Sequence, residues 1–328
     1  MKILITGGSG MLGSAILRMY HQQHELHFIA RNVAIASELE QRYNVTAHII
    51  DLTDKNAVIN ACEGMQAIIH CAALSSPWGT YQQFYQANVQ VTKNVVEAAH
   101  IQGINNIVHI SSTSVYFDYS DRLDIKETDP VAERFCNDYA LTKYLSEKVI
   151  IDGNVKAIIL RPRGIFGPND RAIIPRLLDT IKGHYLFLPS SRNPIVDMTY
   201  VDNVALTAML ACIDIDKLEH GEIFNISNAQ PMPANTMIKM LCCAIKHPVT
   251  ICGLPYRILS PLITLNEWIR TKLPSRPEPK VTCYSAGLLN FHQTINISKA
   301  QSKLGYQPIF TIEQGIAQYA KWFENKNI

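Results

Sequence analysis

The sequence lacks a long hydrophobic run and carries little charge of either sign. No stretch of roughly 18 consecutive apolar residues occurs, so no segment is predicted to cross a bilayer as a helix. Only 18% of the 328 residues are charged, and 30 basic side chains nearly balance 28 acidic ones. This balance leaves no basic face for a nucleic-acid partner. The hydrophobic content of 47% excludes disorder and predicts a large buried core.

Paired cysteines and a signal peptide are also missing. Eight cysteines are scattered along the chain without CxxC spacing, which indicates neither a zinc site nor a disulfide framework. We therefore predict no metal. The opening MKILITGGSG has an apolar run of only a few residues that ends in glycine, unlike a signal peptide. Together these features predict reduced thiols and a cytoplasmic location.

What the sequence does contain is an alternation of apolar runs and helical stretches over its first half. This alternation predicts right-handed βαβ units and an α/β fold with a Rossmann-type, doubly wound parallel sheet. The predicted strands are Lys2–Thr6, Leu26–Ala30, Ala47–Ile50, Ala67–Cys71, Ile107–Ile110 and Val155–Leu160, and the predicted helices lie near 11–23, 33–42, 54–62, 80–101 and 137–151.

The sequence pattern changes after Arg161, where prolines accumulate and the alternation of apolar runs and helical stretches becomes irregular. We expect a dinucleotide-binding Rossmann core over residues 1–162, with elements near 194–226 returning to it. Residues 163–328 are predicted to form a smaller C-terminal region that mainly binds the substrate.

A glycine-rich loop joins the first predicted strand to the first predicted helix. Gly7 suits a tight turn, Gly10 lets backbone amides approach a pyrophosphate, and Gly13 lets the helix pack close to the strand. Met11 and Leu12 complete the loop, whose helix N-terminus would face the phosphates. At this position between strand and helix, the pattern predicts a dinucleotide site.

The second predicted strand ends without the acidic residue that holds the ribose in NAD enzymes. Arg31 stands there instead, where a 2′-phosphate would lie, so we favour NADP over NAD. Asp51 and Leu52 follow the third strand and are predicted to flank the adenine. Ala72 and Ala73 follow the fourth strand and offer small side chains beside the cofactor.

A tyrosine and a lysine four residues apart share one face of a predicted helix at Tyr139 and Lys143. Tyr144 and Lys148 repeat this spacing, so spacing alone does not choose between the two pairs. A nearby ammonium and an oxidised nicotinamide would lower the pKa of a phenol and make it an acid–base group. Ser112, after the fifth strand, could hold a substrate oxygen at the ligand-binding edge of the sheet.

These motifs resemble the extended short-chain dehydrogenases/reductases, the NAD-dependent epimerase/dehydratase superfamily. The resemblance implies that Tyr139, rather than Tyr144, is the proton donor, and that Lys143 lowers its pKa and holds the ribose. It implies that Ser112 orients the substrate oxygen and that Asn88 either serves a proton-relay water or packs its helix. The matching segments are 6–13, 88–95, 109–116, 139–143 and 160–168, and weaker similarity runs the whole length.

Within that superfamily, segments 161–170, 196–205 and 224–233 are most similar to the 3β-hydroxysteroid dehydrogenase-like branch. This branch includes sterol-4-carboxylate dehydrogenases and 2-alkyl-3-oxoalkanoate reductases. The resemblance implies hydride transfer between NAD(P) and a secondary alcohol or ketone on an apolar, sterol-like or 3-oxoalkanoate-like substrate. It places Pro162 beside the cofactor and Thr113, Arg163 and Gly164 beside the substrate. A homodimer through the helices near 80–101 and 137–151 is common in the family.

Two alternatives stay open. The first is an NAD-dependent nucleotide-sugar epimerase, but Val196 stands where such enzymes carry an arginine, and residues 284–297 contain none. Gly164 replaces their asparagine, and Thr113-Ser114 replaces the Asp-Glu of the 4,6-dehydratases. The second alternative is a non-catalytic dinucleotide sensor, which the presence of Ser112, Tyr139 and Lys143 disfavours.

The segment 255–274 is predicted to form a helix with a broad apolar face. Three interpretations remain: core packing, a lid over an apolar substrate, or a patch that makes peripheral contact with a membrane. We favour the latter two and a long-chain or sterol-like keto substrate, with Trp268 near the mouth of the substrate pocket. The apolar positions are 258, 259, 262, 263, 265, 268, 269 and 273.

Overall fold

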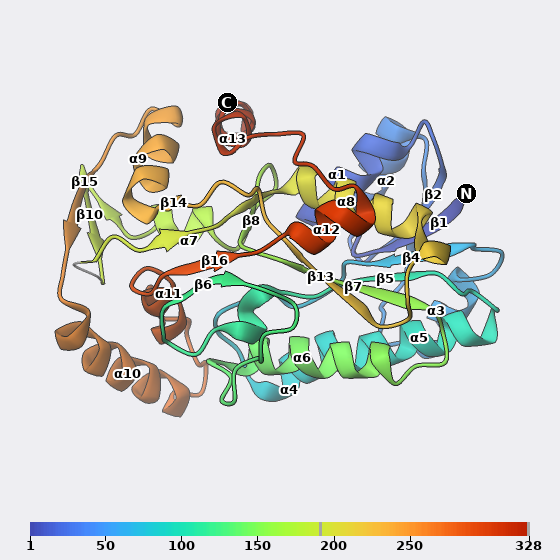
Figure 1. The fold of residues 1–328 in the computed structure, drawn as a ribbon, viewed down its shortest axis with the longest axis horizontal. Helices are drawn as coiled ribbons and strands as arrows, with labels where there is room; N and C mark the ends of the chain where they lie inside the picture. The colour runs from blue at the N-terminus through green and yellow to red at the C-terminus, as the bar shows by residue number, and fades with distance from the viewer. Residues whose placement is uncertain (190–191, 327–328) are drawn as a thin grey trace.

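A parallel seven-stranded sheet forms the centre of the molecule in the computed structural model, which describes residues 1–189 and 192–326 (Figure 1). All neighbouring strands in it run parallel. Its strands are, in spatial order, β13 (Glu222–Ile226), β7 (Ala157–Pro162), β5 (Ile107–Ile110), β4 (Ala67–His70), β1 (Lys2–Thr6), β2 (Glu25–Ala30) and β3 (Thr46–Ile49).

The chain enters this sheet near its middle and builds outward in both directions. From β1 it proceeds through β2 to the β3 edge, then crosses back to β4 and continues to the other edge. The order reverses between β1 and β4, and ligands bind at the carboxyl ends of strands at such a point. The predicted Rossmann-type doubly wound sheet is confirmed.

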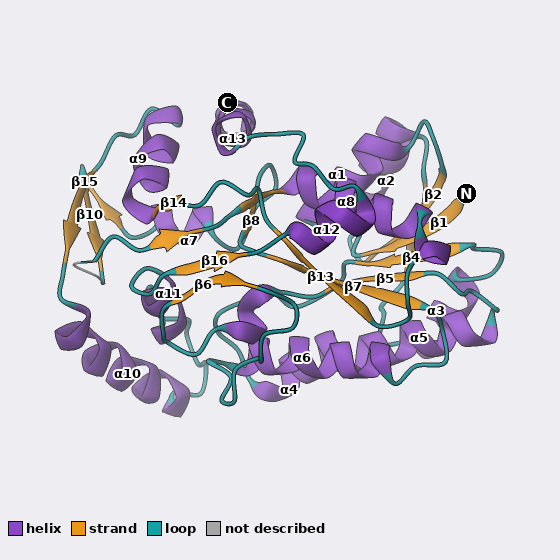
Figure 2. Ribbon diagram, in the orientation of Figure 1, coloured by secondary structure: helices purple, strands orange, loops and turns teal. Residues whose placement is uncertain are grey.

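Helices cover both faces of the sheet, as Figures 1 and 2 show. One face carries α1 (Met11–Tyr20), α2 (Val33–Tyr43), α8 (Val201–Ile213) and α12 (Ser298–Leu304); the other carries α3 (Lys55–Ala61), α5 (Val91–Ile101) and α6 (Asp138–Ile151).

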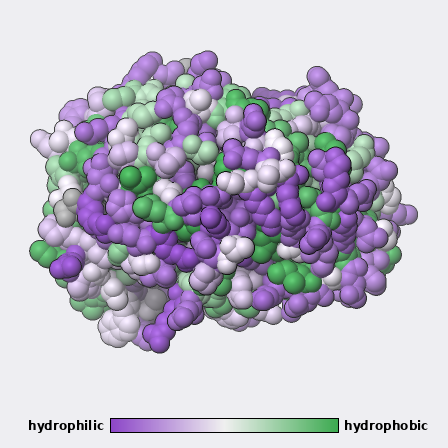
Figure 3. All heavy atoms as spheres, viewed as in Figure 1, coloured by the Kyte–Doolittle hydropathy of each residue, from purple (hydrophilic) through white to green (hydrophobic). Residues whose placement is uncertain are grey.

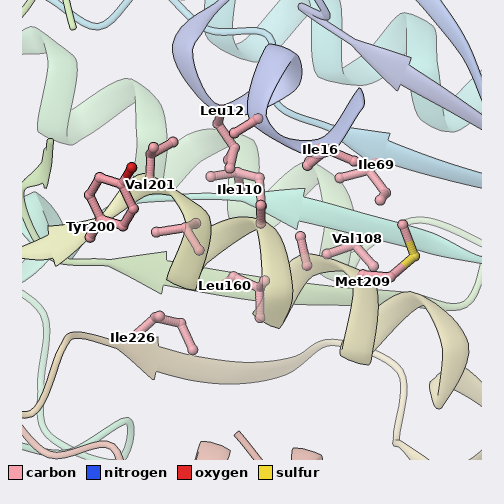
Figure 4. Packing of buried hydrophobic residues seen from close by; sticks show 14 of the residues in the cluster. Leu12, Ile16, Ile69, Val108, Ile110, Leu160, Tyr200, Val201, Met209 and Ile226 are labelled. Atoms are coloured by element: carbon pink, nitrogen blue, oxygen red, sulfur yellow. The ribbon is translucent and has the colours of Figure 1, made fainter. Parts of the chain in front are cut away.

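Successive residues of each strand point to opposite faces of the sheet and pack into two separate hydrophobic cores, one on each face. Val108 packs with Leu12 and Met209 on the α1–α8 side (Figure 4), whereas Ile107 packs with Val95 and Ile150 on the other side. Because both faces are covered, the central strands read as continuous apolar runs, which is why the sequence revealed them.

The predicted helix over 80–101 contains an irregularity. It begins as α4 (Tyr81–Phe84), capped by the side chain of Thr80, widens into a π-helical turn over Tyr85–Gln90, and then continues as α5. The expectation of a homodimer through this helix and α6 stays a prediction.

The rest of the chain forms three small sheets at the end of the molecule opposite the N-terminus (Figure 1). These are β14 (Met232–Pro233), β11 (Ile195–Val196), β16 (Gln293–Ile295) and β6 (Arg122–Ile125); then β15 (Thr250–Gly253), β10 (Tyr185–Leu188) and β9 (Ile181–Lys182); and finally β12 (Thr199–Tyr200) with β8 (Ile165–Phe166). Their helices are α7 (Ile174–Leu178), α9 (Ala234–Ala244), α10 (Tyr256–Lys272), α11 (Cys283–Leu288) and α13 (Ile312–Lys326).

Hydrophilic and apolar side chains are intermixed over the face drawn in Figure 3, and all eight cysteines are free. In the described part of the chain, no helix is both long and apolar enough to cross a membrane, and no cluster of metal-ligating side chains occurs.

Candidate active site

A cavity of about 560 Å³ lies at the carboxyl ends of β1, β4, β5 and β7. The glycine loop forms one wall, the residues that follow β5 and β7 form the floor, and the C-terminal region closes it from above. Its lining is mostly apolar. Of the residues predicted for cofactor or substrate, the cavity brings together Gly7, Gly10, Met11, Leu12, Gly13, Ala73, Ser112, Thr113, Tyr139, Lys143, Pro162, Arg163 and Gly164.

The glycine loop has the close packing that a dinucleotide site needs. Gly7 adopts a φ of +68°, a conformation that few other residues tolerate, and the Gly10 amide donates to the Gly7 carbonyl at 2.9 Å. A side chain at Gly13 would collide with the Gly7 carbonyl oxygen. Because α1 begins at Met11, its unpaired amides face the cavity and can hold a pyrophosphate. The loop therefore fits a nicotinamide dinucleotide.

Four predicted cofactor residues are not among the described residues that line the cavity: Arg31, Asp51, Leu52 and Ala72. Ala72 supports the loop from behind, since a Cβ on Gly7 would lie 3.0 Å from the Ala72 Cα. Arg31 and Asp51 are both exposed. Hydrogen bonds from Thr53 and the nearby charge of Arg31 lower the pKa of Asp51. These two charged groups are therefore neighbours at the ends of β2 and β3.

The structure distinguishes the two tyrosine–lysine pairs on α6. Tyr139 and Lys143 line the cavity together with Ser112. Tyr144 instead packs on Phe135, with ring centres 5.2 Å apart, and Lys148 lies 5.4 Å from the centre of the Tyr144 ring. Only the first pair can therefore reach a ligand in this cavity.

Burial dominates the electrostatics of the pair in the cofactor-free chain. It raises the pKa of Tyr139, and hydrogen bonds from Ser112 and Ser75 only partly oppose this effect. The Lys143 ammonium donates to the Ile110 carbonyl, 2.5 Å away, and the lowering of the Tyr139 pKa by Lys143 and an oxidised nicotinamide stays a prediction. Burial lowers the pKa of Lys143 to about 8, while the charge of Glu147 opposes the shift.

Asn88 is not among the described residues that line the cavity. Its buried amide sits in the π-helical turn, accepts from the Leu74 amide at 2.7 Å and donates to the Thr142 hydroxyl at 3.0 Å. These bonds connect the segment after β4 to α6. The geometry corresponds to the packing role that the sequence left open for this residue.

A buried ionic network beneath Tyr139 was not predicted from sequence. The Arg161 guanidinium donates twice to Glu147, at 2.8 and 2.6 Å, and once to the Tyr116 hydroxyl at 2.6 Å. The Ser111 hydroxyl also donates to Glu147. Because Glu147 lies one helical turn after Lys143, the network attaches α6 to the end of β7. The clue was an arginine directly after the apolar run Ala157–Leu160.

On the substrate side, Arg163 is 6% exposed, yet its guanidinium forms no hydrogen bond or ion pair with the described residues. Burial lowers the pKa of Arg163, although the nearby Tyr284 and Asp197 partly oppose this shift. Gly164 has a φ of +46° and lies against Met198. Other lining residues that sequence reasoning missed are Ser75, Leu188, Val196, Met198, Met237, Tyr284 and Leu288.

Trp268 is not among the described residues lining the cavity, contrary to the expectation that it lies near the mouth. Its side chain is 58% exposed, and the Lys272 ammonium lies 5.9 Å from the centre of its ring. The reason is that Trp268 lies on the solvent side of α10, whereas α11 and the segment before it supply the cavity wall.

Comparisons with known proteins show the family to which the chain belongs. A model of the 3-beta hydroxysteroid dehydrogenase/isomerase family matches residues 4–252. The chain is 32% identical to a 2-alkyl-3-oxoalkanoate reductase of Stenotrophomonas maltophilia, covering 96% of this chain and 97% of that one. It is 30% identical to the decarboxylating sterol-4-alpha-carboxylate 3-dehydrogenase of Saccharomyces cerevisiae, covering 98% of both.

The fold is also that of solved structures with little sequence similarity. The UDP-glucuronic acid 4-epimerase of Bacillus cereus in complex with NAD superposes over 100% of both chains with a TM-score of 0.76, at 20% identity.

Proposed function

Because the chain belongs to the 3-beta hydroxysteroid dehydrogenase/isomerase family, we propose that Tyr139 exchanges the proton in an NAD(P)-dependent interconversion of a secondary alcohol and a ketone. The observation that carries this proposal is the placement of Tyr139, Ser112 and the glycine loop around one cavity. When bound, the nicotinamide supplies or accepts the hydride.

The residues of the chain account for the remaining steps. The Ser112 hydroxyl can hold the substrate oxygen, and the Tyr139 hydroxyl can donate a proton to it as the carbonyl becomes an alcohol. In the opposite direction, the same oxygen of Tyr139 takes the proton. Because burial raises its pKa, Tyr139 is protonated at neutral pH, as the acid role requires. We propose that Lys143, on the same helix face, holds the ribose when the cofactor binds.

We further propose that the preferred cofactor is NADP. Arg31 is exposed directly after β2, at the end of the strand that follows the glycine loop, and can pair with a 2′-phosphate. Its neighbour Asp51 has its carboxylate occupied by the Thr53 amide and hydroxyl, at 2.8 Å each. NAD is the alternative.

For the substrate, we propose an apolar ketone or alcohol that also carries a carboxylate. The cavity of about 560 Å³ has a mostly apolar lining and is of ordinary size for a small-molecule site. The buried Nε of Arg163 has no hydrogen-bond partner, and although the charge of Asp197 acts on the guanidinium, a ligand carboxylate can supply the missing hydrogen bond. In the names of both relatives, a carboxylate is attached to the carbon beside the reacting one.

The Tyr139→Phe variant tests the proton transfer. We expect kcat to fall by about 10²–10⁴-fold, because the phenol acts in the transition state, while the Kd of the cofactor changes little. The matched control is Tyr144→Phe, on the same helix but outside the cavity. Stopped-flow turnover and cofactor fluorescence give the two quantities, and a dead Tyr144→Phe beside an active Tyr139→Phe would contradict the assignment.

The Arg163→Met variant tests the carboxylate. With a long-chain 2-alkyl-3-oxo acid, we expect KM to rise by about 10–100-fold, because a charge-assisted pair is lost. The methyl ester of the same acid has no such pair to lose, and its KM should not change. An equal change for acid and ester would reject Arg163 as the carboxylate anchor and leave the Tyr139 result unaffected.

A further inference from the structure

Three neighbouring strands of the central sheet carry buried polar side chains at the same level. Thr6 is paired with His70 in the register of β1 and β4, and His70 with His109 in that of β4 and β5. All three side chains point to the face covered by α5 and α6, because the residue two positions before each of them belongs to the core on that side. Each is at most 1% exposed, and none is among the described residues that line the cavity.

The hydrogen bonds around His70 can run in only one direction. The Thr92 hydroxyl gives its one proton to the Asn88 carbonyl at 2.6 Å, because a carbonyl can only accept. The Thr92 oxygen therefore accepts the bond from His70 Nε2, 3.0 Å away. Burial, together with the charge of Lys143, lowers the pKa of His70 to about 3 and keeps the ring neutral. A neutral ring that donates from Nε2 accepts at Nδ1, so the Thr6 hydroxyl donates to it at 2.7 Å.

One end of this chain of bonds is the glycine loop. Thr6 directly precedes Gly7, and the Thr6 oxygen also accepts from the Ala72 amide at 3.1 Å. The segment after β4 is thereby held against the loop, where a Cβ on Gly7 would lie only 3.0 Å from the Ala72 Cα. A shift of the Thr6 side chain would therefore displace the turn that fits a pyrophosphate.

The other end is α6, the helix that carries Tyr139. The Asn88 carbonyl ends the chain of bonds, and the side-chain amide of the same residue donates to the Thr142 hydroxyl at 3.0 Å. That hydroxyl in turn donates to the Asp138 carbonyl at 2.8 Å. Because Thr142 lies between Tyr139 and Lys143 on α6, His70 connects the glycine loop to the turn of helix that faces the cavity.

His109 makes a second connection to the same turn. The Ser146 hydroxyl donates to the Lys143 carbonyl at 2.7 Å, so its oxygen accepts from His109 Nε2 at 3.0 Å. The rings of His109 and His70 lie against each other, with centres 5.2 Å apart. The two histidines thus hold the turn from Tyr139 to Lys143 from neighbouring strands.

We propose that His70 is a positioning residue that sets the separation between the glycine loop and Tyr139. The inference rests on the proposed function, because this separation decides where a nicotinamide bound through the loop lies relative to the proton donor. Rates depend steeply on such placement, and a misplacement of about 1 Å can lower a rate by about 10²-fold. His70 acts through hydrogen bonds alone and touches neither cofactor nor substrate.

The test removes the two hydroxyls that bond His70 without changing the shape of their side chains. In Thr6→Val and in Thr92→Val, we expect the single-turnover rate of hydride transfer from NADPH to a long-chain 2-alkyl-3-oxo acid to fall by about tenfold. The double variant should fall by about the same factor rather than by about a hundredfold, because either change already disconnects His70 from one of the two elements. Thr92→Ser, which keeps the hydroxyl, should retain the rate of the wild type.

The matched control is Thr207→Val, a buried threonine of α8 whose hydroxyl donates to the Asn203 carbonyl at 2.8 Å, in the same way as Thr92 donates to Asn88. We expect similar losses of thermal midpoint in Thr207→Val and Thr92→Val, but a slower hydride transfer only in Thr92→Val. Losses of rate that add up in the double variant, or that also appear in Thr207→Val, would overturn the proposal.

Two measurements test the connection without turnover. Nitrogen-15 spectra should show the proton of His70 on Nε2, and a proton on Nδ1 would overturn the proposal. On addition of NADPH, hydrogen exchange of the amides 85–90 should slow in the wild type and in Thr207→Val but not in Thr6→Val. Equal slowing in Thr6→Val would also overturn it. A wild type that shows this slowing but transfers no hydride would count against the proposed function alone.

Discussion

Lys143 is a fully buried ammonium whose charge is unfavourable in the folded chain. Its folded-state pKa of about 8 lies below the roughly 10.4 of an unfolded lysine, so between these values the unfolded chain binds a proton that the folded chain does not. Stability contributed by this group therefore rises from about pH 8 to about pH 10.4. Below pH 8, burying the charge costs about 3 kcal/mol.

We accordingly expect Lys143→Met to increase the free energy of unfolding of the cofactor-free protein at pH 7. The gain should be about 2 kcal/mol, after about 1 kcal/mol is subtracted for the lost bond to the Ile110 carbonyl. Above about pH 10 the gain should disappear. Urea unfolding at pH 7 to 10.5 measures it, with Lys148→Met, an exposed lysine on the same helix, as the control. A gain that does not change with pH would mean that Lys143 has the same pKa in the folded and unfolded chain, so that burial does not lower it.

The proposed preference for NADP over NAD also depends on a single residue, because only the exposed guanidinium of Arg31 is proposed to bind the 2′-phosphate. A charge-assisted hydrogen bond to the 2′-phosphate contributes about 1.5–3 kcal/mol, which predicts about 10–100-fold tighter binding of NADPH than of NADH. In Arg31→Ala the two affinities should converge. The control is Arg42→Ala on α2, whose side chain pairs with Glu38 at 3.6 Å. Equal affinities in the wild type, or unchanged discrimination in Arg31→Ala, would contradict the proposed preference for NADP.

The residues of the site show what sequence could provide. Ser112, Tyr139 and Lys143 belong to local motifs next to a recognisable strand or helix, and the structure puts all three on the cavity. Arg161 and Glu147 were missed because each is ordinary in its own segment, and only the packing of α6 on β7 makes them partners. The raised pKa of Tyr139 likewise follows from burial, which the spacing of residues does not report.

At the scale of elements, the buried strands were predictable because each reads as an apolar run. Predicted Lys2–Thr6 and Ile107–Ile110 have the same bounds as β1 and β5. The strand β6 was not predicted, because Leu123 is exposed, Asp124 has a φ of +55°, and its partner β16 lies far along the chain. The π-helical turn was hidden for a similar reason, since the bond of Asn88 to Leu74 is tertiary.

The residues that form the cavity wall above Tyr139 could not be predicted from the sequence. Met198 lies in a loop between two strands of two residues, and Tyr284 lies in a helix of six residues, so neither segment is long enough to show a period of two or 3.6 residues. The helix α10 shows the opposite case. Its periodicity was evident, but the same pattern fits a buried face and an exposed one, so only the structure separates Trp268 from the cavity.

For the whole molecule, the shared fold raises the question of nucleotide sugars. We expect any UDP-hexose to bind with a millimolar or weaker Kd, although the chain superposes on an epimerase with a TM-score of 0.76. Val196 carries no charge and Arg176 is paired with Glu278, which leaves the buried Arg163 to neutralise no more than one charge of the diphosphate. Isothermal titration with UDP-glucose and UDP-glucuronic acid checks this expectation, with NADPH binding as the positive control. A micromolar Kd would favour the epimerase alternative.

The buried pair of Arg161 and Glu147 also affects how this enzyme can diversify. Removing one partner of such a pair costs about 3–5 kcal/mol, so α6 and β7 behave as one rigid piece that carries both Tyr139 and Arg163. The side chains above them come from short, separate segments that hold no comparable network among the described residues. Mutations can therefore reshape the upper wall and admit a new carbon skeleton while leaving Tyr139 in place. The rigid piece formed by α6 and β7 keeps the residues proposed for the chemistry in fixed positions. The residues of the upper wall, which would contact the substrate, can change by mutation.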